Sequence, residues 1–578
     1  MTQSKVGLAV VVALGVVVQS PPTEACGGFF CSQTPVNQAG ENLLFSIEDD
    51  GTVVAHIQIL YEGDAEDFAW VVPVVAQPEI SVGSNSIFGA LHGLTDPQYY
   101  VSWQDDIGEC GYGDEYWGAP RAEGASDFDA AADGDADEDP QVVVLDRASV
   151  GAYETATISS DDSGALIEWL AENDYRIPDE ARPQIEAYVA AGDVFVALKL
   201  QKNATVGSIT PIVLRFPETG PCIPLRLTSI AATPDMPIWA FVLAPHRAIS
   251  TNFLDVEVND AAIDWFGYGQ NYTAVVTKAV DEAWSHAFVT EFAGDASGLE
   301  GSFFREGQYD TDALRALRDP DQFIQALLNQ GFPRDSTMQE LLRQFIPMPA
   351  ELVEMGITEQ EFYGCVSCWA DYLDGFVFDP EAFVDALEER LIEPLRSVEE
   401  MVGRQRYLTR LFTTISADEM TDDPIFRFNP DVPDVSNVHT AEAVRLCGNG
   451  RDYEDAPVRL TLPDGRVIVY SPGDPGYPGN YAWVDDNGDG INDVTSSAPD
   501  YMPSAERARR LGEAGTGEIL LDNTAAIDDA IAGRFGRPHS ATGGGLGCHV
   551  APADGARRTL PLLLLVGLGL AAFFLRRK

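Results

Sequence analysis

Alternating apolar and polar residues predict β-strands in the first half of the chain. Residues 53–61 place an apolar side chain at every second position, which is the pattern of a strand with one face buried. The alternation returns at residues 194–200. Shorter apolar runs predict further strands at residues 70–75, 212–216, 225–227 and 238–243, and two helices are expected at residues 165–173 and 183–191. A β-rich domain spanning residues 26–277 follows from this pattern.

The apolar period changes to that of helices from about residue 278 to residue 403. Asp-Pro pairs at residues 319–320 and 379–380 suit the N-cap and first position of a helix. Ser336 with Gln339 forms the sequence pattern of a capping box ahead of another apolar stripe. A helical domain is therefore expected at residues 278–446.

A smaller β segment is expected at residues 447–495. Residues 458–462 and 466–470 flank the turn Pro463-Asp464-Gly465, which predicts a hairpin. Residues 496–558 are interpreted as a linker. The expected fold class is α+β: a β-rich N-terminal region, a helical region, a small β and calcium-loop segment, and a C-terminal transmembrane helix.

The first 25 residues have the pattern of a secretory signal peptide. Lys5 supplies a positive charge, residues 6–18 form a short apolar stretch, and small residues lead to cleavage after Ala25. Cleavage there makes Cys26 the first residue of the mature chain. Lipidation of Cys26 is the alternative, which Thr23 and Glu24 disfavour.

Residues 559–575 are predicted to form a transmembrane anchor. A run of 16 uncharged residues covers about 24 Å, against a hydrocarbon core of roughly 30 Å, so the segment just spans with its flanks. The basic residues 576–578 favour the cytoplasmic side and act as a stop. A buried core helix is the alternative.

The charge balance is strongly acidic. The chain has 91 acidic and 36 basic residues, a formal net charge of -55. Such a surface repels phosphate backbones, so nucleic acid is excluded as a partner, whereas cations or an envelope component suit it.

Residues 118–140 are rich in Asp, Ala and Gly and are interpreted as a disordered acidic loop rather than a calcium loop.

The segment from Asp485 to Asp493 predicts a calcium site. Oxygen-bearing side chains stand at loop positions one, three, five and nine, with glycine at six, as a hard cation requires. The predicted ligands are Asp485, Asn487, Asp489 and Asp493, with the carbonyl of Ile491. Position twelve is Ser496 rather than a bidentate Glu, so the loop is not a full EF-hand. The alternative is a turn without metal, because the same residues favour turns.

Eight cysteines in an exported chain indicate disulfides. Cys26 with Cys31, and Cys365 with Cys368, are the expected local pairs. The connectivity of the others stays open. The C-x-x-C of Cys365 and Cys368 lies in a helical region, which favours a structural disulfide over redox catalysis or zinc.

The sequence contains no motif that identifies an enzyme. The seven histidines are scattered, and neither H-E-x-x-H nor G-x-S-x-G occurs. A catalytic set would have to be assembled by the fold, for example around His246, His286 or His439. Whether the protein is an enzyme is therefore left open, with a non-catalytic role favoured.

The mature N-terminus resembles an exported bacterial family of unknown function. The box Cys26-Gly27-Gly28-Phe29-Phe30-Cys31 carries the resemblance, and residues 70–74 and 407–416 fit the same family. The order of glycines, Cys548, apolar segment and terminal cations is similar to the C-terminal sorting tails of myxobacteria. That similarity implies processing near Cys548 and transfer to the outer membrane or cell surface.

Together these features predict an exported, membrane-anchored cell-envelope protein with a structural or binding role. An envelope hydrolase, acting on peptide or glycan, is the alternative. A redox role for the C-x-x-C is the third hypothesis.

Overall fold

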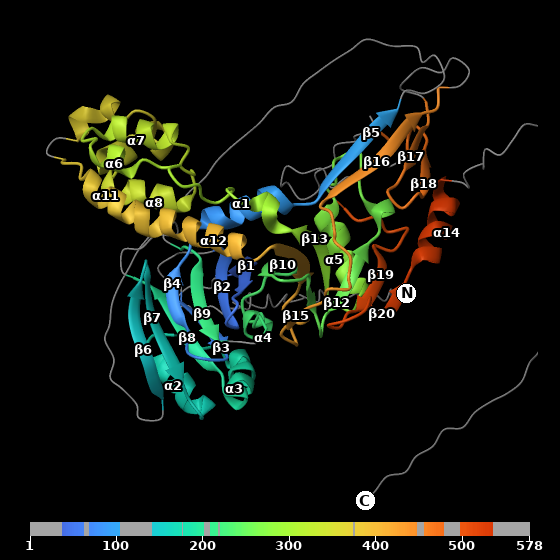
Figure 1. The fold of residues 1–578 in the computed structure, drawn as a ribbon, viewed down its shortest axis with the longest axis horizontal. Helices are drawn as coiled ribbons and strands as arrows, with labels where there is room; N and C mark the ends of the chain where they lie inside the picture. The colour runs from blue at the N-terminus through green and yellow to red at the C-terminus, as the bar shows by residue number, and fades with distance from the viewer. Residues whose placement is uncertain are drawn as a thin grey trace, which may run out of the picture. The chain divides into compact units, whose positions relative to one another are not determined.

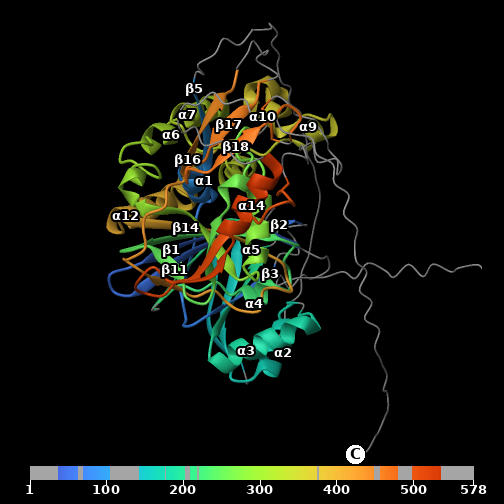
Figure 2. The ribbon, with the colours of Figure 1, turned by 90° about the vertical axis from the view of Figure 1, so that its right-hand side faces the viewer.

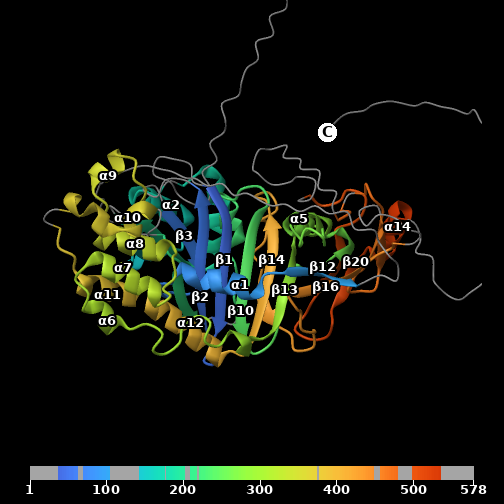
Figure 3. The ribbon, with the colours of Figure 1, turned by 90° about the horizontal axis from the view of Figure 1, so that it is seen from above.

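A ten-stranded mixed sheet forms the centre of the fold (Figures 1 and 3). Its order is β20-β19-β12-β13-β14-β10-β1-β2-β9-β4. In chain order the strands are β1 (Asn37–Ile47), β2 (Thr52–Glu62), β4 (Glu79–Val82), β9 (Ile212–Pro217), β10 (Met236–Ala244), β12 (Leu254–Val258), β13 (Ala287–Asp295), β14 (Tyr407–Ile415), β19 (Ala505–Arg510) and β20 (Glu518–Asp522). The computed structural model describes residues 37–62, 69–104, 142–175, 177–201, 209–217, 220–373, 376–447, 456–474, 476–478 and 497–535.

A four-stranded sheet covers one face of the large sheet. Its order is β3-β8-β7-β6, with β3 (Ala69–Val74), β6 (Val143–Val150), β7 (Tyr153–Ser159) and β8 (Val194–Leu200). Leu43 and Ile57 of the large sheet share one buried cluster with Trp70 and Leu198 of the small one. The outer face of the small sheet packs against α2 (Ser163–Glu172) and α3 (Arg182–Ala191) (Figure 1).

Helices cover the opposite face of the large sheet. Figure 3 shows α1 (Asn85–Thr95) and α12 (Glu393–Arg404) lying across its strands. The neighbouring helical elements are α6 (Thr311–Arg315), α7 (Pro320–Asn329), α8 (Ser336–Phe345), α9 (Ala350–Glu354), α10 (Glu359–Gly364), η6 (Val366–Tyr372), α11 (Pro380–Leu387) and the π-helical turn η7 (Glu388–Ile392). Leu44 and Phe241 from the sheet and Phe323 and Leu395 from the helices belong to the same apolar cluster.

A third sheet, ordered β18-β17-β16-β5, joins distant parts of the sequence (Figure 2). Its strands are β5 (Gln98–Gln104), β16 (Val438–Arg445), β17 (Val458–Thr461) and β18 (Val467–Tyr470). Its core also includes Trp265 and, from α14 (Thr524–Phe535), Ile527.

The remaining elements are the strand pair β11 (Ala248–Ser250) and β15 (Phe426–Phe428), helices α4 (Leu225–Thr228) and α5 (Tyr272–Glu282), and the short turns η2 (Asp179–Ala181), η4 (Asp260–Ala262) and η5 (Ala296–Leu299).

The mixed α+β class is confirmed, as are several elements. The strands expected at residues 53–61, 194–200 and 238–243 are β2, β8 and β10, and the expected hairpin is β17 with β18. Asp319 caps α7 as expected, because its side chain accepts a hydrogen bond from the backbone N–H of Gln322.

Two local predictions were wrong. Residues 225–227, expected as a strand, begin α4, because three apolar residues alone do not distinguish a strand from a buried helical turn. The cap of α8 is Asp335 rather than Ser336: the Asp335 carboxylate accepts from the backbone N–H of Met338. An ionised cap is favoured at the positive end of the helix dipole.

Two predicted boundaries also change. Residues 278–446 are not purely helical, since they supply β13, β14 and β16, and β14 pairs with both β10 and β13. Residues 496–558 are not wholly a linker, since they contain β19, β20 and α14. Strand β19 was missed because its inward side chains are small: Ala505 and Ala508 are buried, alternate with charged residues and give little hydropathy signal.

Several predicted segments lie outside the described residues: the signal peptide (residues 1–25), the acidic loop (118–140), the calcium-like loop and the anchor with its basic stop (559–578). Among the helices that the structure describes, none combines the length and hydropathy that a membrane crossing needs.

Candidate functional site

The structure places only one pair of the predicted site residues. Cys365 and Cys368 form a disulfide, with an S–S distance of 2.00 Å, where α10 ends and η6 begins. Ala25, Cys26, Cys31, Cys548 and the calcium ligands Asp485, Asn487, Asp489, Ile491 and Asp493 lie outside the described residues. Within the described part of the chain, no group of three or more His, Cys, Asp or Glu is arranged to hold a metal ion.

The three histidines considered for a catalytic set have separate surroundings. His246 is exposed. His286 contacts the carbonyl of Trp284 and the hydroxyl of Thr421, each at 3.0 Å. His439 stacks on Tyr99 with ring centroids 4.7 Å apart. Within the described part of the chain, no contact joins any two of them.

A different histidine, His92, meets a carboxylate. His92 and Asp96 are four residues apart at the end of α1, so both face the same side of the helix. His92 Nδ1 lies 2.9 Å from Asp96 Oδ1, and His92 Nε2 lies 2.9 Å from the amide oxygen of Asn42 on β1. Both ring nitrogens therefore have hydrogen-bond partners.

A chain of side-chain amides continues from Asn42. The Asn42 amide N–H donates to Gln58 Oε1 at 2.8 Å, and the Gln58 amide N–H donates to Asn85 Oδ1 at 2.6 Å. Asn85 in turn donates to the backbone carbonyl of Ile209 at 3.4 Å. Since that carbonyl only accepts, it fixes the orientation of every amide before it.

This orientation turns the Asn42 amide oxygen towards His92 Nε2. Partial burial alone would raise the pKa of the Asp96 carboxyl, but the hydrogen bond from His92 and the charge of Arg410 lower it. Asp96 presents a carboxylate oxygen to Nδ1, and Asn42 presents an amide oxygen to Nε2, so the His92 ring is held between two polar side chains.

A buried ion pair completes this cluster. Arg410 on β14 bonds Glu291 on β13, and their side chains are only 3% and 1% exposed. Arg410 also contacts Asp96 and lies over the ring of Phe241, 5.3 Å from its centroid. Burial raises the pKa of Glu291, while Arg410 and the hydroxyl of Tyr272 oppose that rise. His92, Asp96, Arg410 and Glu291 are called the sheet-centre charge cluster below.

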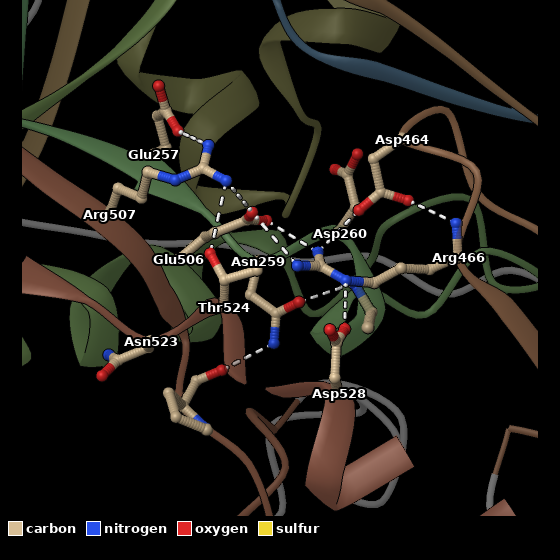
Figure 4. A network of polar contacts seen from close by, with 12 residues as sticks. Glu257, Asn259, Asp260, Asp464, Arg466, Glu506, Arg507, Asn523, Thr524 and Asp528 are labelled. Atoms are coloured by element: carbon tan, nitrogen blue, oxygen red, sulfur yellow. Dashed lines mark hydrogen bonds and ion pairs between the residues drawn. The ribbon is translucent and has the colours of Figure 1, made fainter. Parts of the chain in front are cut away.

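A second polar network ties the C-terminal elements together (Figure 4). Arg466 makes two parallel bonds to Glu506, at 2.8 and 3.1 Å, and further ion pairs with Asp464 at 2.6 Å and Asp528 at 3.0 Å. These carboxylates come from the β17–β18 turn, β19 and α14. The Arg466 guanidinium therefore links the β17–β18 turn, β19 and α14.

Asp260 lies beside that network (Figure 4). Burial, followed by the charges of Asp464 and Glu506, raises the pKa of Asp260 to about 7, against the opposing effect of Arg466. Arg507 pairs with Glu257 at 2.9 Å and with Glu506 at 3.0 Å. Each arginine of the network pairs with at least two carboxylates, so the network stabilises the packing of the strands.

The sheet-centre charge cluster is the strongest candidate site, because half of the Asp96 side chain and a quarter of the His92 side chain remain exposed. Sequence reasoning missed it, although signals existed. Arg410 and Glu291 are charged residues within mainly uncharged strand sequences, and His92 and Asp96 have helical spacing. A charge within an apolar strand indicates a buried partner, but not which one.

Comparison with curated proteins and with solved structures gives no match. One family model matches residues 21–327, more than half of the chain. The match ends within α7, ahead of β14, although β14 lies between β10 and β13 in the sheet. The fold that this region builds thus extends beyond the match. The chain belongs to the family described as "Uncharacterized protein conserved in bacteria (DUF2330)".

Proposed function

We propose that this protein is exported to the bacterial cell envelope, is anchored there by its C-terminal segment, and serves a binding or structural role. The sequence supports export through its signal-peptide pattern and anchoring through residues 559–575. Calcium bound by residues 485–493 is part of the proposal.

The main support for export comes from the disulfides. Cys365 and Cys368 are bonded to each other although Cys368 is exposed, and the buried Cys447 is also disulfide-bonded. Disulfides persist in oxidising compartments and are rare where glutathione keeps thiols reduced. An exposed disulfide between two nearby cysteines would be reduced in the cytosol, which favours a location outside it.

The polar networks favour a binding or structural role. In the sheet-centre charge cluster, Arg410 is paired with both Glu291 and Asp96, and both His92 nitrogens are engaged. In the network of Figure 4, Arg466 is surrounded by three carboxylates. Charged groups arranged in this way hold elements in register and leave few donors for a reacting molecule.

An envelope hydrolase is the second candidate. The His92–Asp96 pair favours it, since a histidine held by a carboxylate is a common general base. For that role, Asn42 would have to release Nε2 to a nucleophile or a water molecule. Loss of hydrolysis of cell-wall peptide or glycan in His92→Gln, but not in His246→Gln, would establish this candidate over the first.

The export proposal is tested by thiol trapping in the native bacterium. Intact cells are acid-quenched and their free thiols are blocked. The proteins are then reduced and labelled with a heavy maleimide, so that each formerly bonded cysteine adds mass. We expect the mature protein in the membrane fraction, beginning at Cys26, with Cys365 and Cys368 labelled only after reduction. The Cys365→Ser/Cys368→Ser variant should carry two fewer labels. Recovery of an uncleaved, fully reduced chain in the cytosol would refute the proposal.

A further inference from the structure

An exposed apolar surface lies on the helical side of the protein. Val353 and Met355 stand at the end of α9 and are 43% and 51% exposed, and Tyr372 at the end of η6 is 45% exposed. The Tyr372 hydroxyl lies 3.8 Å from the Met355 sulfur, so the ends of α9 and η6 meet there, and Val353 stands two residues before Met355. We call Val353, Met355 and Tyr372 the α9–η6 surface. Val377, further along the chain, is 84% exposed.

The base of this surface is rigid. Leu352 of α9 and Val366 of η6 are fully buried in the core beneath the helices. The Cys365–Cys368 disulfide closes the first turn of η6, and Ser367 donates its backbone N–H to Asp321 of α7 at 2.8 Å. A surface held in this way loses little conformational entropy when a partner binds.

Carboxylates border the α9–η6 surface. Glu351, Glu354 and Asp371 are exposed neighbours of its three residues in the sequence. None of these carboxylates has an ion-pair partner within the described part of the chain. The nearby Arg343 is already used, since it makes two bonds to Glu359 at 2.6 and 2.9 Å. The border is therefore negative and uncompensated.

We propose that the α9–η6 surface binds a basic amphipathic helix of a partner protein in the cell envelope. The apolar face of such a helix would cover Val353, Met355 and Tyr372, and its Lys and Arg residues would pair with the acidic border. Methionine adapts to varied apolar partners, and helices bind through apolar anchors spaced along one face. The surface is built from helical turns and offers no strand edge, which disfavours an extended peptide. An anionic membrane is disfavoured by the net charge of -55.

This inference deepens the proposed binding role by giving the partner's chemistry. Its test uses the purified, oxidised full chain and a labelled 18-residue Lys/Leu peptide with helical amphipathicity. A scrambled peptide of identical composition controls for charge. Affinity is measured by fluorescence anisotropy at two salt concentrations. We expect the amphipathic peptide to bind at least tenfold more tightly than the scrambled one, and more weakly as salt rises.

Matched variants locate the binding. Met355→Ser/Tyr372→Ser should weaken it at least tenfold, whereas Ile519→Ser/Leu520→Ser, which removes exposed apolar residues from β20, should leave it unchanged. Glu351→Gln/Glu354→Gln should reduce the salt dependence. A melting midpoint equal to that of the wild type verifies that each variant folds. Equal binding of both peptides, or an unaffected Met355/Tyr372 variant, would overturn the inference, and either result leaves the thiol-trapping test of export unaltered.

Discussion

Arg410 on β14 and Glu291 on β13 form a buried ion pair in the middle of the ten-stranded sheet. A β-bulge makes the contact. The register between the strands shifts between Thr290 and Phe292, which leaves Glu291 as the extra residue. Bulges redirect a side chain relative to the regular alternation. The two charged groups meet because the strand departs from regular geometry at that residue.

Removing the Glu291 charge should strongly destabilise the protein. In Glu291→Gln, the buried Arg410 guanidinium keeps its charge but loses its most buried counter-ion. Breaking a buried pair from one side typically costs about 3–5 kcal/mol. We expect a fall of that order in the free energy of unfolding, measured with urea at pH 7.

The double variant Arg410→Met/Glu291→Leu separates charge from packing, because it removes both buried charges. We expect it to be more stable than Glu291→Gln alone. Arg182→Ala, which breaks an exposed pair with Asp179, should change stability by less than about 1 kcal/mol. A Glu291→Gln protein as stable as the wild type would contradict the importance of the pair.

His56 should make the protein less stable in mild acid. It is buried on β2, and burial lowers its pKa from 6.5 to about 4. Between these values the unfolded chain binds a proton that the folded chain does not. Stability should therefore fall by about 1.4 kcal/mol per pH unit as pH drops from 6.5 towards 4. His56→Gln should flatten this slope, and exposed His246→Gln should not; identical slopes in both variants would rule out His56 as the cause.

Glu41 should have the opposite dependence. It is buried on β1, and burial raises the pKa of its carboxyl to about 7, although a hydrogen bond from Gln38 opposes the rise. The unfolded carboxyl ionises from about pH 4.5, so stability should fall as pH rises from there to 7 and then level off. Glu41→Gln should reduce that loss and be the more stable protein at pH 8. The exposed Glu79→Gln serves as control, and no gain at pH 8 for Glu41→Gln would count against this assignment.

A chain ending at residue 327 should not fold cooperatively. It keeps the whole family match but lacks β14, the strand that pairs with both β10 and β13. Without it, two apolar strand edges are unpaired in the middle of the sheet, and such edges promote aggregation. Residues 26–535 should give a single thermal transition by circular dichroism, and residues 26–327 should not. A soluble, cooperatively melting 26–327 chain would show that the sheet closes without β14.

Calcium should stabilise the protein if residues 485–493 bind it. Calcium at one hundred times its dissociation constant would add about 2.7 kcal/mol to the free energy of unfolding. We expect a chelator to lower the melting midpoint of the wild type but not that of Asp489→Ala. Asp135→Ala, which removes one charge from the other acidic segment, should respond to the chelator like the wild type. A midpoint that the chelator leaves unchanged would remove calcium from the proposal.

Local pattern was sufficient for elements whose buried side chains are large. Alternation identified β2 and β8, and the Asp-Pro pairs at residues 319–320 and 379–380 located the starts of α7 and α11. It failed for β19, where the inward residues are alanines, and for the cap of α8. It also failed to separate β13 and β14 from the helices between them.

The sequence by itself determined the mixed class, many element positions and the acidic charge, because these depend on residues close together in the chain. Only the tertiary structure decided that β14 lies between β10 and β13, and that His92 meets Asn42 while Arg410 meets Glu291. Hydropathy periods report which face of an element is buried but not which distant element covers it. The register of β13 against β14 and the bulge at Glu291 bring this residue to Arg410, and both arise from pairing between segments 119 residues apart.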